Sequence, residues 1–458
     1  MKETRDQGMK VELVDRLIIK PSNRFINNSS ASGIILFSSA FIAIIIANSP
    51  WADSYHAIWK YQFSIGFDQF LISKDLHHWI NDGLMAVFFF VVGLELKREI
   101  IGGELSNVKS AILPIGAAIG GMVFPALVYL AFNREGAGSD GWGIPMATDI
   151  AFSLGVLYLL GDRVPISLKV FLTALAIADD LGAVLVIAFF YSSDIDFTNL
   201  GIGAIFLTVL WIANGIGVRN TLFYALVGIV GLWLAFLLSG VHATIAAVLV
   251  AFAIPANTKV KESHFADHME FLVARFKKAD PNNFSILTKE QLNVLQDIRT
   301  YSKKAITPLQ RLEDNMHPLV AFVIMPIFAF SNAGVTLSDD FLTQLISPVA
   351  LGVMMGLLLG KVIGVVGVSE LIIRFSSVQL PKGMNKLHLW GVGFLAAIGF
   401  TMSLFIAGLA FDEELLIQES KLGILVASLV ASLLGYFLIK NACQKESQKG
   451  SEGGVGTV

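Results

Sequence analysis

Cysteine is almost absent from this sequence, and charged residues are few. The one cysteine among 458 residues is Cys443, so no disulfide framework points to a small secreted fold. Only 15% of the residues are charged and 55% are hydrophobic, with a mean hydropathy of +0.68. A soluble domain of this length needs more polar side chains to cover its surface, and a net charge of −3 gives no reason to expect a nucleic-acid partner. These shortages predict an integral membrane protein in contact with the lipid bilayer.

The N-terminus also lacks the pattern of a cleavable export signal. Residues 1–30 are mixed and charged, and the first apolar run begins near Ala31 without an A-x-A-like cleavage site. We therefore expect residues 1–30 to form a segment that precedes the first span.

Long apolar runs dominate the rest of the sequence. A helix needs about 20 mostly apolar residues to cross about 30 Å of hydrocarbon. The sequence predicts an all-α membrane protein with about twelve transmembrane helices, centred near Ile42, Phe89, Gly121, Phe152, Asp179, Leu207, Val230, Ala247, Pro326, Leu359, Ile398 and Val430. The fourth span is weak by hydropathy because it contains Pro145 and Asp149.

Basic and acidic loops alternate along the chain, which predicts the orientation of the spans. The even-numbered loops are basic, for example at Lys97 and Arg98, whereas the odd-numbered loops are acidic around Asp194 and Asp412. Because basic loops stay in the cytoplasm, we expect both termini there. The predicted divisions are an N-terminal segment (1–30), spans one to eight (31–255), a charged cytoplasmic insert (256–315), spans nine to twelve (316–440) and a cytoplasmic tail (441–458).

Two of the loops contain structure of their own. Residues 58–73 alternate apolar and polar side chains around Gly66, which predicts a small extracytoplasmic β-hairpin; an interfacial amphipathic segment explains the pattern equally well. The insert has helical patterning near His268–Lys278 and Lys289–Lys304, with a Pro281–Asn283 turn between them.

The adjacent carboxylates Asp179 and Asp180 lie in the middle of the fifth apolar run, LTALAIADDLGAVLVIAFF. An ionisable side chain at the bilayer centre costs about 2.5–3.5 kcal/mol on insertion scales, so a sequence that keeps two of them is expected to use them. Two carboxylates this close cannot easily both ionise. The pair therefore suits a site where a small hard cation such as Na⁺ competes with protons. The alternative is structural, with one aspartate capping a broken helix or pairing with Lys361.

Asp149 and Lys361 are the other ionisable residues deep inside apolar runs. Asp149 follows Thr148 in GIPMATDIAFSLG, where Pro145 weakens the helix, so the fourth span is expected to be broken there. Thr148 and nearby carbonyls could then bind a cation, and Asp149 could compensate the positive helix ends. The eleventh span has a second candidate break at Gly399–Thr401. Lys361 could balance the charge of an aspartate or of negative helix ends, or carry a proton itself.

Several ionisable residues lie near the predicted helix ends. Their spacing fits interfacial salt bridges better than a dedicated function, and His242 fits an ordinary interface residue as well as a pH sensor. The residues concerned are Glu95, Arg98, Glu99, His242 and Glu313.

Spans three to five and ten to twelve have opposite orientations in this topology, and the broken spans four and eleven are the middle members of the two triplets. This arrangement is typical of inverted repeats whose broken helices cross near the midplane.

Several motifs, in order along the chain, resemble those of the bacterial NhaA Na⁺/H⁺ antiporters. The matching segments lie between about Asn23 and Leu438 and include FFFVVGLELKREI, MATDIAFSLGVLYLLG, LTALAIADDLGAV, SGVHAT, FAFSNAGV and AAIGFTMSLFIAGLAF. The resemblance implies a secondary active transporter, not an enzyme, in the bacterial inner membrane. It would exchange Na⁺ or Li⁺ for protons, respond to pH, be electrogenic, and need no cofactor.

The resemblance also implies roles for single residues. Asp179 and Asp180 would bind the cation and the protons, beside Thr148 and Asp149 at the first break, with Lys361 opposite. Glu95, Arg98, Glu99, His242 and Glu313 would serve the pH response, Asp82 would affect transport, and the hairpin would join a homodimer.

The sequence departs from the family pattern at the insert, of about fifty residues just before Glu313, and at Asp314, a position often held by histidine. Two other classes of protein also use carboxylates inside membrane helices. An intramembrane aspartyl protease needs Tyr-Asp and Gly-x-Gly-Asp patterns, which do not occur around Asp149 or Asp179. A Na⁺-coupled symporter of an organic solute would use the same cation site and remains the alternative.

Overall fold

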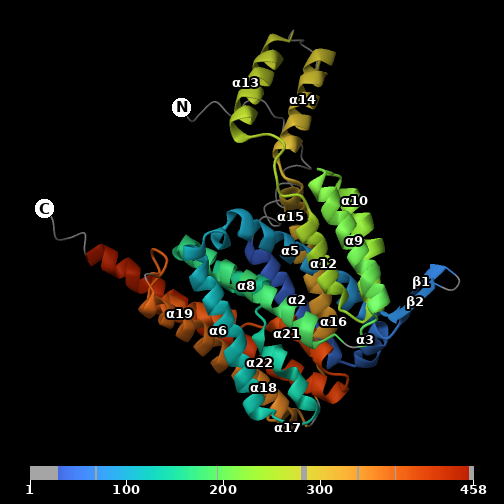
Figure 1. Cartoon of the computed structure of the whole chain (residues 1–458). Coiled ribbons are helices and arrows are strands. Elements are labelled where there is room, and N and C mark those ends of the chain that lie inside the picture. Colours follow the sequence, from blue (N-terminus) through green and yellow to red (C-terminus); the bar gives the residue numbers. More distant parts are fainter. Residues whose placement is uncertain are drawn as a thin grey trace. The chain divides into compact units, whose positions relative to one another are not determined.

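The computed structural model of the chain is built almost entirely of helices (Figure 1). It describes residues 29–67, 70–192, 194–279, 286–337, 340–376 and 378–452. The predicted N-terminal segment therefore lies outside the described residues except for its last two, as do the end of the tail and the Pro281–Asn283 turn of the insert.

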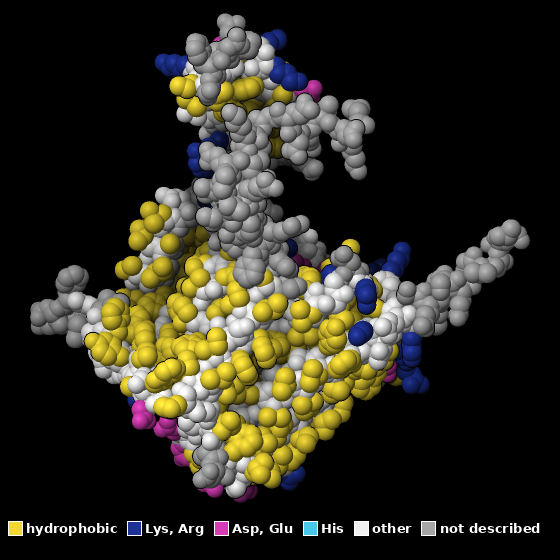
Figure 2. All heavy atoms as spheres, turned by 180° about the vertical axis from the view of Figure 1, so that it is seen from behind, with side chains coloured by type: hydrophobic (Ala, Val, Ile, Leu, Met, Phe, Trp, Pro, Cys, Tyr) yellow, Lys and Arg dark blue, Asp and Glu magenta, His cyan; other side chains and the backbone are white. Residues whose placement is uncertain are grey.

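Helices occur at eleven of the twelve predicted span centres, and the twelfth, Ile398, lies in a break between two helices. Not all of these helices are long, straight and apolar. Within the described residues, seven helices are long and apolar enough to cross a membrane, or nine if each of two bent pairs counts as one span. Large hydrophobic side chains remain exposed on these helices, for example Ile119 and Leu127, and Figure 2 shows such side chains spread over the surface. An apolar surface of this extent is expected of a multi-pass membrane protein. The count of twelve spans stays a prediction.

The larger of two compact units comprises residues 1–88, 102–192 and 318–458. Its helices, some of which extend into the other unit, are α2 (Ser29–Ala47), α3 (Ala52–Trp59), α4 (Leu76–His78), η2 (Trp79–Leu84), α5 (Met85–Gly102), η3 (Glu104–Ser106), α6 (Val108–Phe132), η4 (Ala137–Met146), α7 (Ile150–Tyr158), η5 (Gly161–Arg163), α8 (Ile166–Phe190), η7 (Val320–Ile324), α16 (Met325–Asn332), α17 (Phe341–Leu345), α18 (Pro348–Met355), η8 (Gly356–Lys361), α19 (Val362–Phe375), α20 (Lys386–Ala396), α21 (Phe400–Ala410) and α22 (Glu414–Glu452).

Small residues let the central helices of this unit approach closely. α6 packs against α8 and α19 (Figure 1). A Cβ atom on Gly120 of α6 would lie only 2.3 Å from the backbone oxygen of Gly364 in α19. Glycine contacts of this kind are common between membrane helices, since backbone packing replaces the hydrophobic effect there. Because α6 also packs against α8, this close contact brings the start of α19, and Lys361 directly before it, near α8.

The smaller unit comprises residues 89–101 and 193–317. It contains the later part of α5 together with α9 (Phe197–Gly215), α10 (Thr221–Leu226), η6 (Val227–Trp233), α11 (Leu234–Ser239), α12 (Ala243–Ala253), α13 (Glu262–Lys278), α14 (Lys289–Ala305) and the first part of α15 (Pro308–Leu319). Leu94, Leu210, Leu232 and Ala246 belong to its apolar core.

The insert folds as two helices that lie side by side, α13 and α14 (Figure 1). α14 starts with a capping box, in which Thr288 accepts from the Gln291 amide and the Gln291 side chain accepts from the Thr288 amide. Both helices were predicted, but α13 begins six residues earlier than expected. The boundary at 315 stays a prediction; α15 starts at Pro308 and continues through η7 and α16 to Asn332 as one long apolar helix.

The hairpin predicted at 58–73 is present, with shifted boundaries. Strand β1 (Gln62–Phe67) pairs antiparallel with β2 (Phe70–Asp75), and Gln62 lies opposite Asp75. The predicted first residues belong to α3, whose C-cap is Lys60. The alternating pattern therefore begins after that helix ends.

Candidate functional site

Two broken helices meet in the larger unit. η4 ends at Met146, residues 147–149 are not helical, and α7 starts at Ile150. α20 ends at Ala396, and α21 starts at Phe400 after a bend of 42°. Pro145 contributes to the first break because proline cannot donate a backbone hydrogen bond within a helix. Both breaks were expected from the sequence.

Hydrogen bonds link the two breaks directly. The Asp149 amide donates to the Ile398 carbonyl at 2.7 Å, and the Thr148 hydroxyl donates to the Ala396 carbonyl at 2.7 Å. Two further hydroxyls do the same from either side: Ser153 donates to the Leu395 carbonyl and Ser403 to the Ile144 carbonyl, both at 2.7 Å. Broken helices expose backbone groups that cannot reach water inside a membrane, so each break satisfies groups left open by the other.

The carboxylate of Asp149 accepts hydrogen bonds from the N-terminal ends of α7 and α21, the helices that follow the two breaks. As the N-cap of α7, it accepts at Oδ1 from the Phe152 amide at 2.9 Å. Its Oδ2 accepts from the Thr401 amide at 3.1 Å and from the Thr401 hydroxyl. Both helices therefore direct their positive ends at one buried negative charge. This is the helix-compensating role considered for Asp149, and both of its oxygens already accept hydrogen bonds.

The Lys361 ammonium lies against Asp179. Its Nζ is 2.6 Å from Asp179 Oδ2, and both side chains are fully buried. The ammonium also donates to the Met146 carbonyl, the last residue of η4 before the break. Lys361 is the final residue of the π-helical segment η8, and such segments occur often at functional sites. An ion pair with one aspartate was among the options for Lys361.

Asp180 completes a compact acidic group with Asp179. Both side chains are 1% exposed, and neighbouring helical positions differ by about 100° in direction. Thr148 lies within interaction range of the Asp179 carboxylate. The structure therefore brings the four residues expected to bind the cation and the protons, Thr148, Asp149, Asp179 and Asp180, together with Lys361, which was expected to balance their charge.

The smaller unit holds a second cluster of ionisable side chains, in which one arginine forms ion pairs with two carboxylates. Arg98 lies 2.9 Å from Glu313 and 3.1 Å from Glu99, and Glu95 lies within electrostatic range of all three. Four of the five residues expected in the pH response are thus grouped, with more negative than positive charge.

His242 lies away from this cluster within the same unit. It is the N-cap of α12, whereas Lys97 of α5 donates at the other end of that helix, to the carbonyls of Phe252 and Ile254. α12 has 11 residues, which corresponds to about 16 Å. His242 therefore does not share a site with Arg98 and its carboxylates.

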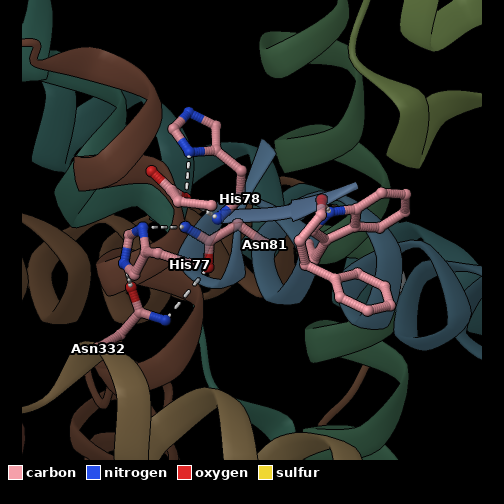
Figure 3. Close-up of polar contacts among 7 residues, drawn as sticks. His77, His78, Asn81 and Asn332 are labelled. Carbon is pink, nitrogen blue, oxygen red and sulfur yellow. Dashed lines mark hydrogen bonds and ion pairs between the residues drawn. The ribbon is translucent and has the colours of Figure 1, made fainter. Parts of the chain in front are cut away.

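Asp82 lies half-buried in the π-helical segment η2. A closed network fixes the start of this segment to α16: His77 bonds Asn332 at 3.0 Å and Asn81 at 3.3 Å, and Asn332 donates to Asn81 at 3.2 Å (Figure 3). These three residues were not singled out in the sequence, although polar residues within apolar helices are a general sign of such networks.

Comparison with known proteins places the chain in a family. The family described as Na⁺/H⁺ antiporter 1 matches residues 23–439. The chain belongs to this family. A Na⁺/H⁺ antiporter NhaA from Oleidesulfovibrio alaskensis is 48% identical over 434 residues, which is 94% of this chain and 96% of that protein. Na⁺/H⁺ antiporter NhaA 1 from Saccharophagus degradans is 48% identical, covering 95% of this chain and 94% of its own length. NhaA from Acidithiobacillus ferrooxidans is 45% identical, with coverage of 94% and 99%.

Family membership confirms the resemblance read from the motifs, but those motifs did not reveal every residue of the site. Thr401 was noticed only as part of a break, and Ser153 and Ser403 not at all. The signal that could have found the serines is a small hydroxyl residue within about one turn of a predicted break, since such residues can satisfy freed carbonyls.

Proposed function

We propose that the chain is a Na⁺/H⁺ antiporter, a secondary active transporter and not an enzyme. Na⁺/H⁺ antiport is the activity in the names of its relatives. The observation that carries the proposal is the buried Asp179–Asp180 pair with Lys361 at 2.6 Å from Asp179, next to two crossed helix breaks. A single site of this kind can hold either hydrogen ions or an alkali cation.

Lys361 balances the charge of Asp179 after that carboxylate has lost its proton and before a cation is bound. Its ammonium lies beside Asp179 Oδ2, where a metal cation would also have to lie. Na⁺ binding therefore requires the ammonium to move away, and its return helps to expel the ion. Removing either partner of a buried ion pair leaves an uncompensated charge. Replacing the ammonium by Na⁺ beside Asp179 therefore costs less free energy than leaving the carboxylate with no cation at all.

Exchange follows if the ionised, empty site cannot cross the membrane. On the cytoplasmic side, Asp179 and Asp180 lose protons and bind a partly dehydrated Na⁺; on the outer side, protons displace it. If two protons leave the site for each sodium ion that enters, one net charge crosses per cycle. This net charge movement makes the transport electrogenic, and the membrane potential then assists sodium export by about 2.3 kcal/mol per 100 mV.

The crossed breaks provide a fixed point around which the site can change sides. We infer inverted repeats in spans three to five and ten to twelve, with a total of about twelve spans. Asp149 neutralises the two helix starts at the crossing, so Na⁺ at Asp179 and Asp180 meets less repulsion from them. Direct binding of Na⁺ or Li⁺ by Thr148 or Asp149 remains part of the proposal.

The remaining expectations belong to the same proposal. Glu95, Arg98, Glu99 and Glu313 would set the pH response, with His242 acting from a separate position and Asp82 influencing transport from η2. The protein would lie in the bacterial inner membrane with both termini in the cytoplasm, and the hairpin would join two copies into a dimer.

The deciding experiment measures sodium-dependent proton flux in proteoliposomes that contain no organic solute, scanned over pH with Na⁺, Li⁺ and K⁺. The wild type should respond to Na⁺, and Asp180→Asn should abolish the response because one of the two exchangeable carboxylates is lost. Asp412→Asn changes the same charge at an exposed site and should leave the flux unchanged. Full flux in Asp180→Asn would reject the assignment. A response that needs an added organic solute would instead favour the symporter.

A further inference from the structure

A basic pocket lies in the smaller unit, and neither the site nor the antiport mechanism uses it. Its cavity measures about 250 Å³. Thr300 and a short apolar wall line part of it, and five cationic side chains line the rest: Arg219, Lys259, Lys303, Lys304 and Arg311. We call these five residues and their cavity the basic pocket.

The insert (256–315) supplies four of the five cations of this pocket, and Arg219 comes from outside it. Lys303 and Lys304 lie in the last turn of α14, Arg311 lies in the first turns of α15, and Arg219 lies between α9 and α10. Backbone hydrogen bonds hold these segments together: the Lys259 amide donates to the Lys304 carbonyl, and the Leu309 amide to the Pro255 carbonyl, both at 3.3 Å. These bonds fix three of the four segments to one another, and Arg219 reaches the same cavity from the fourth.

Among the described residues, none of the five cations forms a salt bridge. The nearby insert carboxylate Asp297 pairs instead with Arg275, at 3.7 Å. The five cations line one cavity of about 250 Å³, so their charges act on the same small volume. Five converging positive charges without acidic partners favour an anion in the cavity.

Two ordinary explanations account for part of this charge. Basic residues near a helix C-terminus offset the negative end of its dipole, which explains Lys303 and Lys304. Basic residues in cytoplasmic loops orient a membrane protein, which explains an excess of positive charge in the loops. Neither explains why Arg219, Lys259 and Arg311, from three other segments, line the same cavity as that lysine pair.

We propose that the basic pocket binds a phosphate-bearing anion and thereby ties the insert to the membrane helices of its unit. Arginine forks match phosphate oxygens in pairs, and lysines add point charges. The cavity volume suits one or two phosphate groups rather than a large organic ligand. The phosphate comes either from a free anion of the cytosol or from the headgroup of an anionic lipid. The second source is accessible because Arg219 lies between two apolar helices, at the level where headgroups lie.

The test uses the full-length protein and two matched double variants. Lys303→Gln with Lys304→Gln removes two charges from the basic pocket, and Lys277→Gln with Lys278→Gln removes two from the last turn of α13, outside the pocket. Gel filtration and a cooperative thermal unfolding transition without added anion confirm that both variants are folded. Pyrophosphate is then titrated in detergent against thermal unfolding, with ionic strength held by choline chloride.

The pocket variant should bind pyrophosphate about 30-fold more weakly, from about 1 kcal/mol for each lysine, and the α13 variant should bind like the wild type. Arg219→Gln, on the opposite wall, should weaken binding in the same direction. A second arm compares nanodiscs of phosphatidylcholine with nanodiscs that also contain phosphatidylglycerol.

The two arms separate the sources of the phosphate. Stabilisation by pyrophosphate but not by phosphatidylglycerol identifies a free anion, and the reverse identifies a lipid headgroup; either must depend on Lys303 and Lys304. Equal behaviour of the pocket and α13 variants in both arms overturns the proposal, because the response then reports general positive charge. These readouts do not depend on antiport, so the proposal can fail while the transport assignment holds.

Discussion

Single polar atoms hold the two broken helices together. Asp149 accepts hydrogen bonds from three donors at the crossing, and two of them come from Thr401. The hydroxyls of Ser153, Ser403 and Thr148 each bond a carbonyl of the opposite chain segment. Because water is excluded there, losing one donor leaves a buried polar group without a substitute partner.

Thr401→Val keeps the shape of the side chain but removes the hydroxyl that donates to Asp149. We expect a loss of stability of about 1–3 kcal/mol and reduced transport, measured as the midpoint of thermal unfolding in detergent and as proton flux. Thr208→Val is the matched control, since the Thr208 hydroxyl is exposed and bonds only within its own helix, to the Ala204 carbonyl. Equal melting of the two variants would contradict the role given to Thr401.

Replacing Lys361 tests the buried ion pair. Lys361→Ala leaves the buried Asp179 carboxylate without its cation, and breaking such a pair costs about 3–5 kcal/mol. We expect a lower unfolding temperature and weaker voltage dependence of flux, with little change in the preference between Na⁺ and Li⁺.

A second substitution separates the charge effect from lost packing. Adding Asp179→Asn to Lys361→Ala removes the uncompensated negative charge and should recover part of the lost stability, whereas transport should be lost because Asp179 can no longer bind the cation. If the double variant is no more stable than Lys361→Ala alone, the ion pair is not the source of the effect.

At the scale of elements, helix contacts decide where the charged groups lie. α6 and α19 approach through glycines, and a Cβ on Gly121, the neighbour of Gly120, would lie 2.9 Å from Val365 Cγ2 and 3.5 Å from Lys361 Cε. The position of Lys361 therefore depends on the spacing of two helices as well as on its own ion pair.

Gly120→Ala should destabilise the protein, since the new methyl group would overlap the Gly364 carbonyl at 2.3 Å. Overpacking of this kind costs about 1–3 kcal/mol. Gly367→Ala, in α19, is the control because no atom lies within 4 Å of a Cβ there, and alanine favours a helix over glycine by up to about 1 kcal/mol. The two variants should shift the unfolding temperature in opposite directions. A neutral Gly120→Ala would mean that α6 and α19 are less closely packed.

At the scale of the whole molecule, the hairpin presents two strand edges, of which the β1 edge accepts one hydrogen bond, from the Trp79 indole to the Phe63 carbonyl. It is a two-stranded sheet, and such sheets are marginally stable alone and expose backbone groups that can pair with another chain. Pairing with the hairpin of a second copy would satisfy one edge in each.

Deleting residues 62–75 and joining the ends with a short glycine linker should convert the proposed dimer to a monomer. Native mass spectrometry in mild detergent measures the change, and proton flux per chain should be largely retained because the aspartates lie elsewhere. A deletion variant that remains dimeric would show that other surfaces carry the association.

The sequence alone determined the class of the protein and the candidates for its site. Long apolar runs allow few structures other than membrane helices, and charges inside them are costly enough to be noticed individually, which is how Asp149, Asp179, Asp180 and Lys361 were found. The resemblance to the family was visible for the same reason, since its motifs surround these residues.

The tertiary structure decided which partner each charge has. Lys361 could have met any aspartate, and only the packing of α6 against α19 and α8 places it against Asp179 rather than Asp149. Thr401 is 252 residues from Asp149 in the chain yet donates to it, and the convergence of Arg219 with the lysines of α14 is equally remote. Hydropathy and spacing describe each segment by itself, whereas a contact between distant segments depends on how their helices pack.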